Sequence, residues 1–241
     1  MSVPDEPLDR LANLRDVSDA APQVVPGVLW RSSQPLAGDG PPENFPAWPP
    51  RTVVDLRSAA EVGDTPHPLL GEGTTVQQVH LLDAAGDPEA LADRRRSLAE
   101  VYLSMLEPGT GLVRAVELVA DAPGPVLVHC AAGKDRTGIV VALALRLAGV
   151  APASVLADFA LTTQAMPAVM RRLLASMPGL ADVDVSTVPA EFFTAPAEAL
   201  QAVLDVWDAA PGGVEGWARA HGGSPDLAGR LTRRLAPEGA A

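Results

Sequence analysis

The sequence predicts one α/β domain over 1–241, with a central, largely parallel sheet flanked by helices and a C-terminal helical extension. Short aliphatic runs at 52–56 and 126–128 are typical of buried strands in such a sheet. A helix-forming segment leads into the second run, as a right-handed β-α-β crossover requires. The composition, 47% hydrophobic and 20% charged, suits a globular chain. We expect its core at about 20–165 and the extension at about 166–236.

Extended segments and turns dominate the first half of the chain. Pro26 and Gly27 form a turn signal between two short extended runs, so we expect a small hairpin there. The segment TVVDL at 52–56 predicts a buried strand, and Ser58 followed by Glu61 predicts a helix start with a capping box. The segment 74–82 alternates and then becomes apolar, which predicts a third strand.

The second half of the chain is mostly helical. An amphipathic helix is expected at 89–106 and another helix at 112–120, ahead of the strand at 126–128. The segment 137–147 is apolar on nearly every face, which indicates a buried helix. Further helices are expected at 153–163, 165–176, 196–209, 214–221 and 226–235. The segment 166–195, which carries several Met and Phe residues, suits either an apolar cover over a pocket or ordinary core packing.

The loop between the strand at 126–128 and the helix at 137–147 carries the strongest signal, HCAAGKDR. A tight loop that enters a helix N-terminus points several backbone N–H groups into one bowl, where the helix dipole adds positive potential. Such a bowl suits a phosphate group. Cys130 at its floor is favoured as thiolate by the same N–H groups and the neighbouring cations. Arg136 can donate two hydrogen bonds to phosphate oxygens, so the loop predicts a nucleophile beneath a phosphoryl group.

Composition singles out the same loop. Of 18 Lys and Arg residues only Lys134 is a lysine, and Cys130 is the one cysteine of the chain. A chain that avoids both residue types elsewhere places its one copy of each here. The alternative is a buried structural thiol beside an incidental cation. A lone cysteine also leaves no internal disulfide, so the fold does not depend on an oxidising compartment.

The pattern Cys-x5-Arg, preceded by His129 and followed by Thr-Gly, resembles the signature of the cysteine-dependent protein tyrosine phosphatases. The longer form HCAAGKDRTG resembles a bacterial branch with tyrosine and dual-specificity phosphatases, some of which act on phosphoinositides. Further similar segments are NLRD at 13–16, GVLWRSSQP at 27–35, DLRSAAE at 55–61 and VLADFALTT at 155–163. The resemblance implies a tyrosine-phosphatase-like fold and phosphatase activity on phosphotyrosine, with phosphoserine, phosphothreonine and phosphoinositides as further candidate substrates.

The resemblance also implies roles for the loop residues. Cys130 would attack phosphorus and form a phosphocysteine intermediate, which water hydrolyses. Thr137 would donate a hydrogen bond to the cysteine sulfur, and His129 would orient the loop. The phosphate oxygens would be bound by the loop segment Ala131, Ala132, Gly133 and Lys134 together with Arg136 and Thr137. No cofactor or metal is expected, because the His, Cys, Asp and Glu positions show no metal-ligand spacing.

The acid that protonates the leaving oxygen is less clearly marked. In the family an aspartate on a loop does this, and Asp83 is the first candidate by its place in the order of elements. Asp87 is a weaker one, and ordinary turn chemistry is the alternative for both. Asp135 could be the acid or could pair with Lys134 or Arg136. We favour the pairing, because two cations oppose protonation of a carboxylate.

Several other charged or polar residues carry two interpretations. Asn13 and Asp16 are expected to bond nearby backbone in a turn. Arg31 suits structural pairing better than steering of an anionic substrate. Asp55 and Arg57 are expected to form a charge pair that ties loops together.

Lys134 would add a cation at the rim of the pocket, which suits substrates with more than one phosphate. The three consecutive arginines at 94–96 are expected on a solvated helix face rather than against an anionic partner.

The net charge of −12 argues against a general nucleic-acid binder and against tight adsorption to anionic membranes. The longest apolar run is too short to span a membrane, so no stable anchor is expected. The acidic first residues lack the apolar segment of a signal peptide, so we expect a cytoplasmic protein, with export by another route left open. Phosphorylated proteins or phosphoinositides are the expected partners. A phosphate-binding module without turnover is the main alternative, and rhodanese-type sulfur transfer is a more distant one.

Overall fold

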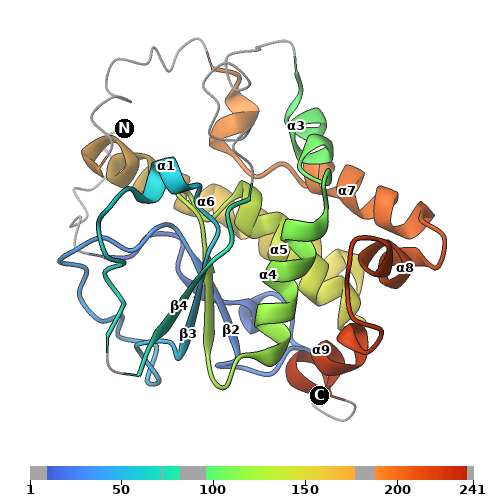
Figure 1. Cartoon of the computed structure of the whole chain (residues 1–241). Helices are drawn as coiled ribbons and strands as arrows, with labels where there is room; N and C mark the ends of the chain where they lie inside the picture. The colour runs from blue at the N-terminus through green and yellow to red at the C-terminus, as the bar shows by residue number, and fades with distance from the viewer. Residues whose placement is uncertain (1–9, 72, 82–95, 177–187, 238–241) are drawn as a thin grey trace.

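A five-stranded sheet forms one side of the molecule, and helices gather on the other side (Figure 1). The computed structural model describes residues 10–71, 73–81, 96–176 and 188–237. The strand order is β1-β2-β5-β3-β4, in which β1 runs antiparallel to β2 and the other neighbours are parallel. The strands are β1 (Arg15–Asp16), β2 (Leu29–Ser32), β3 (Thr52–Asp55), β4 (Thr75–Gln78) and β5 (Val126–His129). The α/β class and the largely parallel sheet are therefore confirmed.

The side chains of the three inner strands alternate between two hydrophobic clusters, as the strand period requires. Val54, Val126 and Val128 pack into the large core beneath the helices. Val53 and Leu127 point to the opposite face, where they pack with Trp30 and with loop residues that include Trp48. The strands are thus buried on both faces, which explains the consecutive apolar residues Leu29–Trp30, Val53–Val54 and Val126–Val128.

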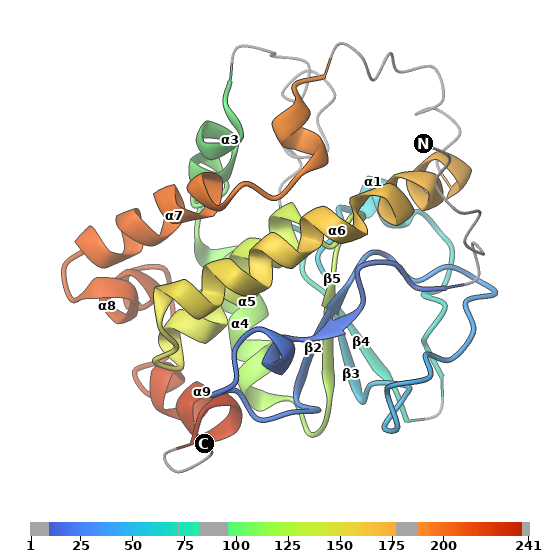
Figure 2. The ribbon, with the colours of Figure 1, turned by 180° about the vertical axis from the view of Figure 1, so that it is seen from behind.

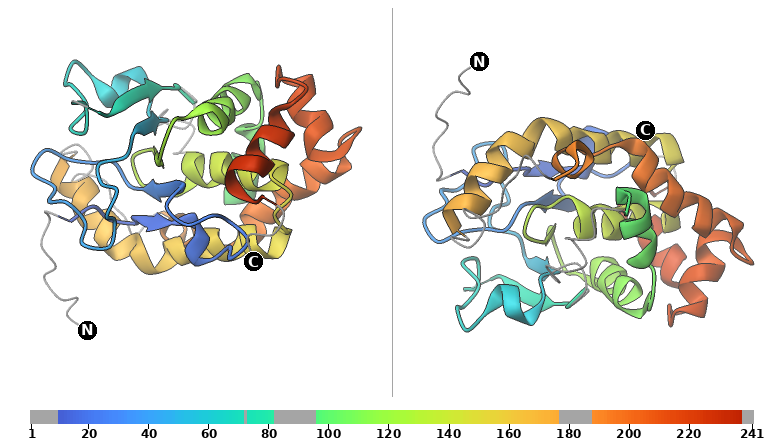
Figure 3. Two further views of the ribbon diagram at one scale, coloured as in Figure 1. Left: turned by 90° about the horizontal axis from the view of Figure 1, so that it is seen from below. Right: turned by 90° about the horizontal axis from the view of Figure 1, so that it is seen from above.

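Helix α5 (Asp135–Leu147) lies at the centre of the helical layer, and both views in Figure 3 show it between α4 and α6. It also contacts α7, α8 and α9. Seen from behind, α6 passes across α5 (Figure 2). The remaining helices are α1 (Ala59–Val62), α3 (Leu98–Ser104), α4 (Thr110–Asp121), α6 (Pro152–Ser176), α7 (Ala197–Ala209), α8 (Gly213–Ala220) and α9 (Leu227–Leu235), with 3-10 turns η1 (Val17–Asp19) and η4 (Ala190–Phe193). None of the helices in the described ranges is long and apolar enough to cross a membrane.

Two sequence expectations differ from the structure. The hairpin at Pro26 and Gly27 does not form, because β2 pairs with β1, which lies before η1 in the chain. The two helices expected at 153–163 and 165–176 are one helix, α6, which continues through Pro167. Proline removes one helical hydrogen bond, but Met166 and Val169 on either side of it are buried and hold the helix in place. The division expected at residue 166 therefore falls within α6.

Candidate active site

The predicted phosphate loop follows β5, the central strand, and leads into α5 at the carboxyl edge of the sheet. The loops after β2 and β3 lie at the same edge, since these strands are parallel neighbours of β5. Sites in open α/β sheets lie at this edge. Three loops that are far apart in the sequence therefore meet around Cys130, whose side chain is only 2% exposed.

Gly133 allows the loop to close against the end of β2. Its φ of 68° is in the left-handed region, which favours glycine. A Cβ atom there would lie 2.1 Å from the carbonyl oxygen of Ser32. No other residue fits this position without moving the backbone of one segment or the other.

All four carbonyl groups of residues 130–133 bind groups outside the loop. The carbonyl of Ala131 accepts a hydrogen bond from the Gln34 amide at 3.0 Å. The carbonyl of Gly133 accepts from Asn13 Nδ2 at 3.0 Å and from Arg31 Nη2 at 2.8 Å. The Ala132 carbonyl also accepts from Asn13, at 3.3 Å, and the Cys130 carbonyl lies 3.3 Å from His129 Nδ1.

These contacts determine where the loop amides point. In a trans peptide the N–H group points away from the carbonyl, so the amides of residues 131–134 face the inside of the loop. Within the described part of the chain these four amides donate no hydrogen bond. Amides that converge in this way are what binding of an anion by the loop would require.

A buried ion network supports the outer side of the loop. Asp158 on α6 binds Arg31 at 2.5 Å and Arg15 at 2.8 Å, and its side chain is 1% exposed. Burial alone would raise the pKa of Asp158, but Arg31 and Arg15 outweigh it and hold this pKa below its ordinary value. The structural pairing predicted for Arg31 is confirmed. Asp16 bonds nearby backbone at Ser18, as expected, whereas Asn13 reaches the distant loop instead.

Arg136 presents one free edge of its guanidinium group. Its Nη1 donates to Glu61 Oε2 at 2.6 Å and to the Leu56 carbonyl at 3.2 Å, and its Nη2 donates to Glu61 Oε1 at 2.7 Å. Three of the five N–H groups thus bind described residues, and the two that bind none of them are on Nε and Nη2. These two lie on the same edge and can bind two phosphate oxygens. Burial opposes the charge, but the bonds to Glu61 raise the pKa of Arg136 above its ordinary value.

Glu61 was predicted only as a helix cap. The capping box with Ser58 is present, and the same carboxylate also binds both terminal nitrogens of Arg136. Burial would raise the pKa of Glu61, but the hydrogen bonds from Arg136 lower it below its ordinary value. The capping box is the sequence signal for Glu61, and it predicts the contact with Ser58 but not the contact with Arg136.

Thr137 is placed differently from the expectation. Its side chain is fully buried, and its hydroxyl oxygen has no hydrogen-bond partner among the described residues. The predicted hydrogen bond from Thr137 to the Cys130 sulfur is therefore not formed here. Thr137 is the third residue of α5, so the helix rather than the loop determines the direction of its side chain.

Lys134 is not a free cation at the rim of the pocket. Its side chain is 3% exposed, and Nζ donates to the carbonyls of Phe192 at 2.8 Å and Thr194 at 3.0 Å. These carbonyls belong to η4 and the residue after it. Lys134 therefore fastens the C-terminal helical part of the chain to the phosphate loop.

Asp135 lies next to Lys134 and uses one carboxylate oxygen. Tyr102 donates its hydroxyl hydrogen to Oδ1 at 2.7 Å, and Lys134 Nζ lies 3.3 Å from the same oxygen. Burial raises the pKa of Tyr102 well above its ordinary value, so this hydroxyl remains a donor. The pairing with Lys134 that the sequence suggested is present. Asp83 and Asp87 lie outside the described residues.

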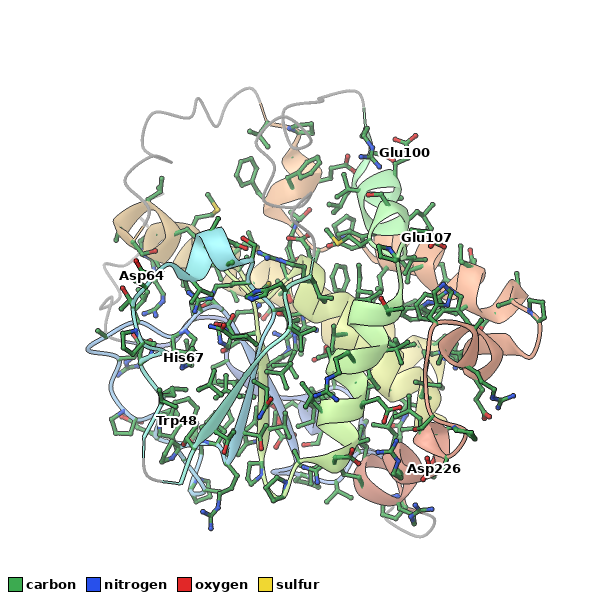
Figure 4. The ribbon with its side chains drawn as sticks, in the orientation of Figure 1. Trp48, Asp64, His67, Glu100, Glu107 and Asp226 are labelled. Atoms are coloured by element: carbon green, nitrogen blue, oxygen red, sulfur yellow. The ribbon has the colours of Figure 1, made fainter. Side chains whose placement is uncertain are left out.

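A buried cluster behind the loop brings together Asp55, His67 and His129, whose potential ligand atoms lie within 4.8 Å of one another. Figure 4 shows His67 in the segment between α1 and β4. Asp55 already binds Arg57 through both oxygens, which confirms the predicted charge pair. His67 Nδ1 accepts the Leu69 amide, so its Nε2 carries the proton. With that nitrogen protonated and a guanidinium group beside it, the cluster does not fit a cation.

The mostly parallel sheet, with β5 at its centre and α5 directly after it, forms a tyrosine-phosphatase-like fold. A sequence model described as the tyrosine phosphatase family matches residues 6–236. The chain belongs to this family and is a phosphatase, a hydrolase.

Two relatives illustrate the similarity. The triple specificity protein phosphatase PtpB of Mycobacterium tuberculosis is 30% identical over 193 residues, which cover 67% of this chain and 70% of the relative. A tyrosine-protein phosphatase of Nostoc commune is 32% identical over 114 residues, which cover 45% of this chain and 39% of the relative.

Proposed function

We propose that this phosphatase hydrolyses phosphotyrosine monoesters in two steps, with Cys130 as the nucleophile. The sulfur attacks phosphorus, the S–P bond forms as the P–O bond to tyrosine breaks, and water then hydrolyses the phosphocysteine. The loop amides and the free edge of Arg136 would bind the equatorial oxygens, where charge lies in the transition state. The observation that carries this proposal is the set of four amides around the buried Cys130 that donate no hydrogen bond to any described residue.

We assign protonation of the leaving oxygen to Asp135. Three other described carboxylates near the loop each bind arginine through both oxygens, namely Asp55, Glu61 and Asp158. Toward the described residues Asp135 uses only Oδ1, so Oδ2 can carry a proton while Oδ1 still accepts from Tyr102. This choice reverses the preference drawn from the sequence, in which Asp135 only positioned its neighbours and Asp83 was the first candidate.

The wider substrate range also belongs to the proposal. The name of the M. tuberculosis relative supports testing phosphoserine and phosphothreonine beside phosphotyrosine. Phosphoinositides with a second phosphate would need a free cation at the rim, but Lys134 binds two carbonyl groups there. We therefore expect phosphotyrosine to be the better substrate.

A substrate panel tests the reaction. Phosphate release is measured on phosphotyrosine peptide, phosphothreonine peptide and a phosphoinositide, in the presence of a chelator, with Cys130→Ser as the control. Release that disappears in Cys130→Ser supports the mechanism, and the isolated phosphocysteine of an acid-quenched reaction identifies the intermediate. A folded wild-type chain that binds vanadate but releases no phosphate from any substrate would indicate a phosphate-binding module.

The acid is tested by comparing leaving groups. Asp135→Asn should slow hydrolysis of alkyl phosphates about 100-fold but affect aryl phosphates with a weakly basic leaving group much less. Asp83→Asn should affect neither class to this extent. The opposite result would transfer the role to Asp83.

A further inference from the structure

Two imidazole rings meet behind the phosphate loop. His67 Nε2 and His129 Nε2 lie 2.9 Å apart, and the ring centres are 5.1 Å apart. His129 is fully buried and His67 is 7% exposed. A distance of 2.9 Å between two ring nitrogens requires one proton between them, because two lone pairs or two N–H groups would repel each other.

One backbone amide determines which ring carries that proton. The Leu69 amide donates to His67 Nδ1 at 3.1 Å, so this nitrogen has no hydrogen. A neutral His67 then has its hydrogen on Nε2 and donates it to His129 Nε2. His129 in turn has its hydrogen on Nδ1, which faces the Cys130 carbonyl at 3.3 Å. The hydrogen bond from the Leu69 amide therefore determines the direction of the bond between the two rings and of the bond to the Cys130 carbonyl.

The charges around the pair suit this neutral arrangement. Asp55 Oδ1 lies 3.8 Å from His129 Nε2, but Arg57 binds both oxygens of Asp55. The positive charge of Arg136 also opposes protonation of His129. Burial lowers the pKa of His129, and burial together with the neighbouring His129 lowers the pKa of His67 to about 4. Neither ring is charged near neutral pH.

We propose that His67 is a positioning residue for the phosphatase reaction, which fixes His129 in its Nδ1–H form and thereby aims the Ala131 amide at the phosphate. The Cys130 carbonyl and the Ala131 amide belong to one peptide plane, so a hydrogen bond to the carbonyl orients the amide in the opposite direction. His67 touches neither substrate nor Cys130 sulfur. The inference rests on the proposed role of the loop as the phosphate site.

The protonation pattern can be read directly from long-range proton–nitrogen spectra of histidine-labelled wild-type enzyme at pH 7.5. The chain has four histidines. His80 and His221 bring Nδ1 within 2.8 Å and 2.7 Å of carbonyl groups, which also favours their Nδ1–H forms. We expect His67 to be the histidine with its hydrogen on Nε2, and His129 to be neutral with its hydrogen on Nδ1. A charged His129, or a His67 with its hydrogen on Nδ1, would overturn the inference.

Three variants then test the function. His67→Leu leaves His129 Nε2 without a donor and should lower kcat about tenfold with little change in KM, while His129 becomes protonated at a higher pH. His67→Gln places an amide donor near the position of Nε2 and should restore most of kcat. His221→Gln lies far from the loop and should match wild type. If His67→Leu and His67→Gln lose the same activity, the hydrogen bond donated to His129 Nε2 does not contribute to kcat and the inference is wrong.

These outcomes separate the inference from the proposed function. An inactive wild-type enzyme with the expected protonation pattern would contradict the phosphatase mechanism alone. An active enzyme with a different pattern would contradict only the role of His67. The spectra of the wild-type enzyme remain decisive if His67→Leu does not fold.

Discussion

Glu61 decides which edge of Arg136 faces the phosphate loop, because its carboxylate occupies the end of the guanidinium group. The Glu61→Gln variant keeps one oxygen but loses the charge that makes both bonds strong. We expect kcat/KM for an aryl phosphate to fall about tenfold, equivalent to ~1.4 kcal/mol of transition-state binding. Steady-state kinetics at constant ionic strength measure this.

Glu100 provides the matched control for Glu61. It closes the same kind of capping box, with Ser97, and it lies at the outer end of α3 (Figure 4). Glu100→Gln therefore removes an equivalent helix cap without touching Arg136. Equal losses of activity in the two variants would show that helix capping, and not the contact with Arg136, is responsible.

His67 should also make stability depend on pH. Its folded pKa of about 4 lies below the value of about 6.5 for an unfolded histidine. The unfolded chain therefore gains a proton first as the pH falls, so stability is full above pH 6.5 and is lost progressively towards pH 4. We expect His67→Gln to lose less unfolding free energy than wild type between pH 7.5 and 5, by on the order of 1–2 kcal/mol. Urea unfolding at both pH values measures the difference, and parallel curves would contradict it.

At the scale of the elements, the close contact between the phosphate loop and β2 depends on Gly133. In Gly133→Ala the new Cβ meets the Ser32 carbonyl, so one backbone segment must move and the amides lose their common direction. We expect phosphatase activity to fall at least ~100-fold, as when oxyanion donors are lost, and vanadate binding to weaken with it.

The Gly149→Ala variant is the control that distinguishes a clash of the new Cβ from backbone strain alone. Its φ of 84° is also left-handed, but nothing lies within 4 Å of the position of its Cβ. Gly149→Ala should cost about 1–2 kcal/mol of stability and retain activity. If Gly133→Ala retains activity as well, the close contact between Gly133 and the Ser32 carbonyl is not what orients the loop amides.

Lys134 couples η4 to the loop, and as the one lysine of the chain it can be studied selectively. Replacing it by Met removes a charged hydrogen-bond donor worth about 1.5–3 kcal/mol. We expect amide exchange in the segment Ala190–Ala195 to become at least tenfold faster, as followed by mass spectrometry. Arg146→Met, which removes another cation bound to a carbonyl but away from η4, should leave this exchange unchanged.

Local patterns predicted the elements but not their contacts. The strand runs, the apolar α5 and the Ser58–Glu61 capping box were readable because each lies within about 12 residues of chain. The bonds Asn13–Gly133, Glu61–Arg136 and His67–His129 join residues 120, 75 and 62 positions apart. No periodicity or spacing connects such positions, so the sequence placed Asn13 in a local turn and gave His67 no role.

At the scale of the whole molecule, the N-terminal segment and α6 hold the loop from outside. Asn13 and Arg31 of β2 donate to the loop carbonyls. Asp158 of α6 binds Arg31 and also Arg15 of β1. The predicted phosphate loop is thus held by parts of the chain that lie far from it in sequence. Changes in α6 should therefore reach the active site through Arg31.

Asp158 is the test of this arrangement, because it is the carboxylate that binds both Arg15 and Arg31. Removing one member of a buried ion network leaves uncompensated charge and costs about 3–5 kcal/mol. We expect Asp158→Ala to lower the urea midpoint strongly and, in the fraction that remains folded, to reduce kcat because Arg31 no longer fixes the Gly133 carbonyl. Asp208→Ala breaks the more exposed pair with Arg146 and should cost about 0.2–1 kcal/mol with activity unchanged. If the two variants are equally stable, the network does not hold the N-terminal segment to α6, and the loop must be oriented by Asn13 and Gln34 alone.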